Sequence, residues 1–121
     1  MTKSKYKSAR IKKLKELLDQ LVKENLSSRN AQVHLYYARV LEEISENDSA
    51  LLEYESLINY FPGQEAKCRY GLLLKKLGQL GKADDLFNRI IREVTRGPRY
   101  YRKTEAVWLE TAKKNLSTSV K

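Results

Sequence analysis

The stretch from 31 to 95 repeats itself with a period of 33 residues. When the sequence is shifted by that period, apolar and small residues coincide, while the polar residues between them differ. The coincident pairs are Tyr37 and Tyr70, Ala38 and Gly71, Leu41 and Leu74, Ala50 and Ala83, and Tyr54 and Phe87. A period of this length is typical of repeat proteins, in which each unit buries its apolar face against a neighbour. The repeat therefore predicts an array of equivalent units, and binding as its mode of action.

The composition favours helix in these units. Only five Gly and two Pro occur in 121 residues, and Leu, Lys, Glu and Ala are abundant. These residues have high helix propensity. With 41% hydrophobic and 32% charged residues, the chain is typical of a globular protein with a modest core. We therefore expect an all-α fold, with one domain over 9–116 between a disordered basic tail at 1–8 and a polar tail at 117–121.

Apolar periodicity and turn residues divide this domain. Spacings of three and four residues predict helices, and Gly or Pro marks their ends. Ser27, Ser28 and Asn30 are candidate caps for the first helix of the repeat, and Asp48 for the second. The predicted parts are an N-terminal packing helix and turn at 9–30, repeat 1 at 31–63, repeat 2 at 64–97, and a C-terminal capping helix at 98–116.

Two amphipathic faces are specified by this pattern. In the first helix of repeat 1 the residues expected inside are Val33, Tyr36, Tyr37, Val40, Leu41 and Ile44. In the N-terminal helix the apolar stripe is formed by Ile11, Leu14, Leu18, Leu21 and Val22. This stripe suits docking on the next helix of the domain, because it lacks the Trp or Phe typical of helices that lie on membranes. Binding to an anionic membrane is the alternative.

The pattern resembles the tetratricopeptide repeat, a helical hairpin that is close in length to the 33-residue period of this chain. The family's small or large signature positions hold Gly71, Leu74, Gly78, Ala83 and Phe87 in repeat 2, and Ala38, Leu41, Ser45, Ala50 and Tyr54 in repeat 1, which Pro62 closes. Small residues at two of these positions let the two helices of a hairpin approach closely, and the large ring fills the space toward the next hairpin. The resemblance implies antiparallel hairpins stacked as a short right-handed α-solenoid of about six helices. The segment from Leu35 to Gly78, with the helix that contains Trp108, is also similar to the C-terminal part of uncharacterised bacterial tetratricopeptide proteins.

Catalysis is not expected from the residues available. His34 is the only histidine and Cys68 the only cysteine, so neither a metal cluster nor a histidine-based catalytic set can be assembled from several of them. Lys67 and Arg69 flank Cys68, and cations can activate a thiol, but a structural role is the commoner one. Gly78 and Gly81 belong to a turn without a phosphate-binding motif. We predict a non-enzyme without a cofactor.

The resemblance also implies a binding groove, because the first helix of each hairpin lines it in this family. The family's contact positions correspond to Gln32, Leu35, Arg39, Glu42 and Glu43 in repeat 1, and to Glu65, Cys68, Leu72, Lys75 and Lys76 in repeat 2. An apolar floor with a charged rim suits an extended peptide or a partner helix. The expected function is that of a protein–protein interaction scaffold, and the expected partner is a protein or peptide. Filling of the groove by the flanking helices is the alternative.

The charge distribution supports a second function. The net charge is +9, with an acidic middle at 31–66 between two basic flanks. Such polarity can steer acidic partners, although it equally suits attraction between successive repeats. The basic candidates are the Lys-rich N-terminus and a patch of Arg89, Arg92, Arg96, Arg99, Tyr100, Arg102 and Lys103, next to Tyr101. Arginine binds phosphate and aromatic rings stack on bases. The alternative function is therefore binding of RNA, DNA or an anionic membrane surface, and self-association is a further option.

No apolar run is long enough to cross a bilayer, and no apolar signal-peptide core follows the basic N-terminus. A single cysteine is consistent with a reducing compartment. We expect a cytoplasmic protein, with attachment to the cytosolic face of a membrane through a partner or an anchor as the other arrangement.

Overall fold

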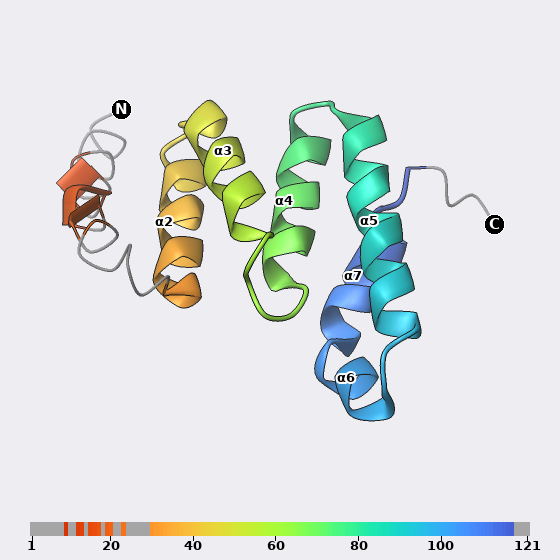
Figure 1. Ribbon diagram of the computed structural model, residues 1–121. Coiled ribbons are helices and arrows are strands. Elements are labelled where there is room, and N and C mark those ends of the chain that lie inside the picture. Colours follow the sequence, from red (N-terminus) through yellow and green to blue (C-terminus); the bar gives the residue numbers. More distant parts are fainter. Residues whose placement is uncertain are drawn as a thin grey trace. The chain divides into compact units, whose positions relative to one another are not determined.

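The computed structural model describes residues 30–117, together with Ala9, Lys12, Lys13, 15–17, Asp19, Gln20 and Lys23. Every secondary-structure element in this described part is a helix, which confirms the all-α prediction (Figure 1). The chain divides into two compact units, Met1–Phe61 and Pro62–Lys121. Their boundary falls at the Pro62–Gly63 pair that marks the end of repeat 1. The predicted tail at 1–8 and most of the tail at 117–121 lie outside the described residues.

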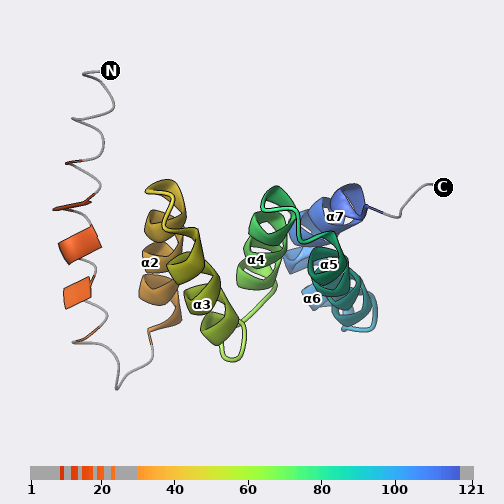
Figure 2. The ribbon, with the colours of Figure 1, turned by 90° about the horizontal axis from the view of Figure 1, so that it is seen from above.

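Unit 1 contains a helical hairpin of α2 (Ala31–Glu43) and α3 (Asn47–Leu57), which pack side by side (Figures 1 and 2). Asn30 caps α2 as expected, because its Oδ1 accepts a hydrogen bond from the Val33 N–H at 3.1 Å. Ser27 and Ser28 lie outside the described residues. Asp48 is not the cap of α3 but lies within its first turn. A carboxylate there still interacts favourably with the positive end of the helix dipole.

Residues of the N-terminal segment contact this hairpin. The described residues between 9 and 23 are helical, and Lys15 Nζ lies 3.1 Å from Glu46 Oε1. Burial and then a hydrogen bond to Asp19 raise the pKa of the Tyr37 hydroxyl above its ordinary value. The apolar stripe predicted to dock here lies outside the described residues.

Unit 2 contains a second hairpin, formed by α4 (Glu65–Lys76) and α5 (Leu80–Thr95), and two further helices, α6 (Arg99–Thr104) and α7 (Ala106–Asn115). The helix α7 packs along α5 and also contacts α4 (Figure 2). Among the described helices, none has the combination of length and apolar character needed to cross a membrane.

The two hairpins turn in the same way. Ser45 follows α2 with φ +64°, and Gly78, exactly one period later, follows α4 with φ +85°. At each turn this residue donates its N–H to the carbonyl three residues earlier, and the next residue donates to the carbonyl five residues earlier, at 2.8–3.0 Å. This is the Schellman arrangement, which satisfies the last carbonyls of a helix. The turn position of the repeat is therefore structurally equivalent in both units, although only one copy is Gly.

The buried face of α2 differs from the predicted one. Leu35, Ala38 and Leu41 have no exposed surface, whereas Tyr36, expected inside, is 49% exposed. Successive residues of a helix are rotated by about 100°, so a face centred on Leu35 turns Tyr36 outward. Leu35 and Tyr36 are both apolar, and the periodicity alone does not decide between them.

The predicted C-terminal helix is two helices, because the chain bends at Glu105 (φ −99°, ψ 13°). The bend contains neither Gly nor Pro. Instead, the Glu105 carboxylate is buried and its Oε1 accepts a hydrogen bond from the Gln64 N–H at 2.7 Å. A contact with the start of α4, 41 residues away in sequence, thus accompanies the break.

Gly71 lies against the ring of Phe87, so α4 and α5 are in close contact at this point. A Cβ atom on Gly71 would lie 2.7 Å from Phe87 Cε1, and Phe87 is fully buried. The equivalent residues of unit 1, Ala38 and Tyr54, are likewise fully buried. The small and large signature positions of the repeat are therefore core positions.

We expect Gly71→Ala to destabilise the protein and Gly81→Ala to stabilise it slightly. Alanine gains about 1 kcal/mol of helix propensity over glycine, but overpacking against the buried Phe87 ring costs about 1–3 kcal/mol. At Gly81 no atom lies within 4 Å of the added Cβ. Urea unfolding followed by circular dichroism measures both changes, and equal free energies of unfolding for the two variants would contradict the tight contact.

Candidate binding surfaces of the two hairpins

One face of α2 carries an aromatic–cation pair. Its residues are exposed or half-buried and recur at intervals of four, three and four, so they form one stripe along the helix. They are Gln32, Tyr36, Arg39 and Glu43, called the α2 face. The Arg39 guanidinium lies 5.9 Å from the centroid of the Tyr36 ring, within the range of a cation–π interaction. The α2 face thus offers an aromatic ring with a cation beside it and a carboxylate one turn further along the helix.

The equivalent face of α4 has different chemistry. A shift of 33 residues carries the α2 face onto Glu65, Arg69, Leu72 and Lys76, called the α4 face, all of which are exposed or half-buried. Arg69 Nε donates to Glu65 at 2.9 Å, and its guanidinium lies 5.6 Å from the centroid of the Trp108 ring. Here Leu72 is the apolar residue, and charged side chains border it.

Six of the ten predicted groove residues lie on these faces: Gln32, Arg39, Glu43, Glu65, Leu72 and Lys76. The other four are used within their own units. Leu35 and Cys68 have no exposed surface. Glu42 accepts a hydrogen bond from the Tyr54 hydroxyl at 2.9 Å, and Lys75 Nζ donates to the carbonyl of Asn115 at 3.1 Å and to its side-chain oxygen at 3.2 Å.

Tyr36 and Arg69 lie on these faces but are not among the predicted groove residues. Both occupy the sixth position of the repeat, whereas the family's usual contact positions include the fifth, held by Leu35 and Cys68. The signal was present in the sequence, because Tyr36 continues the helical spacing that runs from Gln32 to Arg39 and Glu43.

The lone cysteine and the lone histidine are both integrated into the fold. Burial raises the pKa of the Cys68 thiol to about 11, an effect that the nearby Arg69 only partly opposes, so the thiol is protonated at neutral pH.

His34 joins α2 to α3 and to the chain that follows α3. Its Nε2 lies 2.7 Å from Glu53, and its Nδ1 lies 2.6 Å from the Tyr60 hydroxyl. Within the described part of the chain, no three metal-binding side chains converge.

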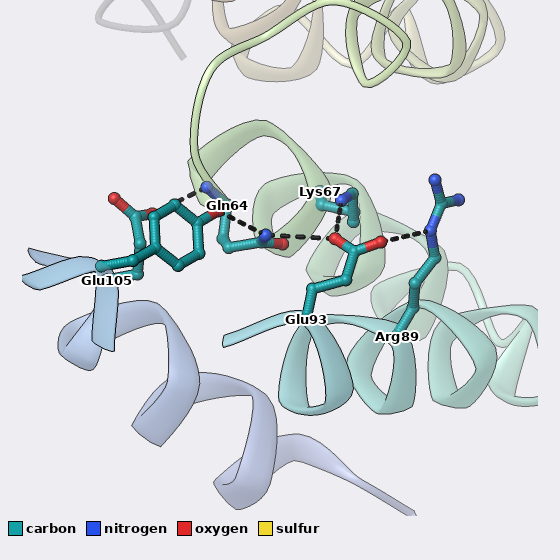
Figure 3. Close-up of polar contacts among 6 residues, drawn as sticks. Gln64, Lys67, Arg89, Glu93 and Glu105 are labelled. Atoms are coloured by element: carbon teal, nitrogen blue, oxygen red, sulfur yellow. Dashed lines mark hydrogen bonds and ion pairs between the residues drawn. The ribbon is translucent and has the colours of Figure 1, made fainter. Parts of the chain in front are cut away.

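A polar network in unit 2 fixes the beginning of α4 (Figure 3). Gln64 donates from its backbone to Glu105, and its side-chain Nε2 donates to Glu93 at 3.1 Å and to the Tyr101 hydroxyl at 2.8 Å. Lys67, only 8% exposed, donates to Glu93 Oε1 at 2.5 Å. The network therefore ties α4 to α5, to α6 and to the bend before α7.

Glu93 is the acceptor at the centre of this network. Arg89 Nε donates to its second oxygen at 3.2 Å. Burial alone would raise the pKa of Glu93, but the hydrogen bonds from Lys67 and Gln64, with the charge of Lys67, outweigh it and hold the pKa below the ordinary 4.5. The carboxylate form is thus the one that the folded unit stabilises.

The predicted basic patch divides into engaged and open residues. Arg89 pairs with Glu93, and Arg102 Nη1 donates to the Gly97 carbonyl at 2.6 Å. The open residues are exposed and form no ion pair with any described residue: Arg92, Arg96, Arg99 and Lys103. Tyr100, between them in sequence, is 73% exposed. Most of the Lys-rich N-terminus lies outside the described residues.

Comparisons of the chain with protein-family models, curated proteins and solved structures found no significant match.

We expect Glu93→Gln to lower the melting temperature near neutral pH, and this loss to shrink as the pH falls below about 4.5. A group whose pKa is lowered by folding contributes stability above its unfolded pKa, and loses that contribution as it protonates in the folded state. Glu110→Gln, on the exposed side of α7, is the matched control and should change little. Equal melting temperatures for both variants at neutral pH would contradict a stabilising role for the network.

Proposed function

We propose that this chain is a non-enzymatic protein-interaction module, built from two hairpins of the tetratricopeptide type, that binds a peptide or partner helix. The observation that carries the proposal is the equivalence of the α2 face and the α4 face. The same four positions of the repeat are exposed or half-buried in both hairpins, and their side chains differ, whereas the small and aromatic core positions are alike. Constant packing positions with variable exposed ones are expected where the fold is a scaffold and the surface sets specificity.

The composition of the α2 face favours a protein ligand. Tyrosine and arginine are enriched in the energetically dominant positions of protein interfaces, because each combines a large contact area with hydrogen-bonding groups. Tyr36 is half-exposed beside Arg39, so its ring is available while its orientation is already restrained. A partner would supply an apolar side chain against this ring and an acidic group to Arg39.

The α4 face suits the same kind of segment with another anchor. Leu72 is the apolar contact, and Lys76 and Arg69 provide positive charge around it. An amphipathic peptide with an apolar anchor and acidic residues beside it suits either face. The Schellman turns and the network at Gln64 support this role, because binding residues on rigid elements lose less conformational entropy on association.

A reducing, cytoplasmic setting is part of the proposal. The only cysteine is buried and unpaired, so the fold does not depend on an oxidising compartment.

The test begins by selecting peptide ligands from a random display library with the full-length chain. The dissociation constant of the best peptide is then measured by isothermal titration calorimetry for wild-type protein and for single variants. We expect Tyr36→Ala to weaken a peptide that binds the α2 face, and Leu72→Ala one that binds the α4 face, about tenfold or more in each case, since truncating a central interface residue costs about 1–2 kcal/mol.

Leu52→Ala is the control, because Leu52 lies on α3 of unit 1 and is 65% exposed. It removes a comparable apolar side chain from outside the two faces and should leave the affinity unchanged. A selected peptide whose affinity falls with Leu52→Ala but not with Tyr36→Ala or Leu72→Ala would overturn the assignment of the faces.

A further inference from the structure

We propose that the exposed basic residues around Tyr100 bind single-stranded nucleic acid. The surface consists of Arg92, Arg96, Arg99, Tyr100 and Lys103, called the Arg–Tyr surface. It lies at the end of α5 and on α6 in unit 2 (Figure 1), and it does not rest on the α2 and α4 faces.

The charge of this surface is not neutralised within the described part of the chain. Its four cations are exposed and form no ion pair there. The only acids between 89 and 105 are Glu93 and Glu105. Glu93 accepts hydrogen bonds from Lys67, Gln64 and Arg89, while Glu105 is buried against the Gln64 N–H. The network of Figure 3 thus satisfies both carboxylates locally and leaves the four cations for an external anion.

Local geometry holds the cations close together. Arg92 lies in the last turn of α5, and Arg96, four residues further on, is its C-cap residue. Both are on the side opposite the buried Ile90 and Val94 and therefore neighbour one another. Arg99 and Lys103 have the same spacing on α6. Arg96 and Arg99 are joined by the turn at Gly97 and Pro98, and three residues of chain span at most about 11 Å.

The turn itself is fixed by two contacts. Arg102 donates to the carbonyl of Gly97, and a Cβ atom on Gly97 would lie 2.9 Å from Tyr101 Cδ2. Tyr101 is in turn held by Gln64 through its hydroxyl. Arg96 and Arg99 are consequently presented on a restrained backbone rather than on a free loop.

The side-chain chemistry selects the kind of anion. Guanidinium groups bind phosphate oxygens in pairs, and an aromatic ring beside them provides a platform on which an unpaired base can stack. Tyr100, at 73% exposure, is the most exposed large hydrophobic side chain described. The sequence of α6 contains no Leu, Ile, Phe or Trp, so it lacks the apolar face with which a helix enters a membrane.

The proposal is tested with the full-length chain and a fluorescein-labelled oligouridylate of about 12 nucleotides, a length within the range of single-strand sites. Fluorescence anisotropy gives the dissociation constant across a series of salt concentrations. We expect salt-sensitive binding that is tighter for the single strand than for a duplex of the same length, because stacking on Tyr100 requires an unpaired base.

Two charge-matched variants locate the site. R92Q/R96Q/R99Q should weaken binding at least about tenfold and reduce the salt slope by about 2, since each phosphate contact to a single strand contributes about 0.7. K82Q/K113Q/K114Q removes the same charge from other exposed positions and should change the affinity less than about twofold. Equal losses in the two variants would show attraction by net charge alone and would overturn the site.

Substitutions at Tyr100 separate stacking from charge. Tyr100→Phe keeps the ring and should preserve the affinity, whereas Tyr100→Leu should weaken it by about fivefold or more. Circular dichroism checks that each variant is folded. Undetectable binding at low salt, equal affinity after Tyr100→Leu, or tighter binding to vesicles of anionic lipid or to an acidic peptide would each overturn the proposal.

Discussion

The close contact of Gly71 with the Phe87 ring is the constraint on which unit 2 depends. It brings α4 and α5 together at a point where a single methyl group would collide with a fully buried aromatic ring. Because packed interiors tolerate little change in volume, this contact fixes the rotation of α4 about its own axis. The same rotation turns Glu65, Leu72 and Lys76 outward. One small residue in the core is thus linked to the side chains that α4 presents on its surface.

The polar network complements this apolar contact at the beginning of α4. Lys67 is buried, and a buried ammonium group is costly unless it is paired. Glu93 supplies that pairing, and its own carboxylate is then shared among Lys67, Gln64 and Arg89. Packing and surface charge are linked through this arrangement. Glu93 and Glu105 are bonded to groups in the interior of unit 2, so they do not offset the exposed cations at the end of α5 and on α6.

Several elements could be predicted from the sequence because their causes are local. The helices of both hairpins follow from apolar spacing, the cap from Asn30, and the turns from the residues at Ser45 and Gly78. The bend at Glu105 could not be predicted, since it lacks Gly and Pro and its carboxylate bonds to Gln64 far away in sequence. The predicted burial of Tyr36 and exposure of Leu35 are wrong for a related reason. Hydrophobicity places both near the core, and only the packed structure decides which one enters it.

Because Cys68 is buried, its rate of reaction with a thiol reagent measures how often this part of the chain opens. Its Sγ is the only thiol in the sequence, it has no exposed surface, and its high pKa keeps it protonated. A thiol reagent reacts with the exposed thiolate, so modification has to wait for an opening that brings Sγ into solvent. The labelling rate of Cys68 therefore depends on how often α4 opens locally. It detects openings that are too rare to change the average helix content.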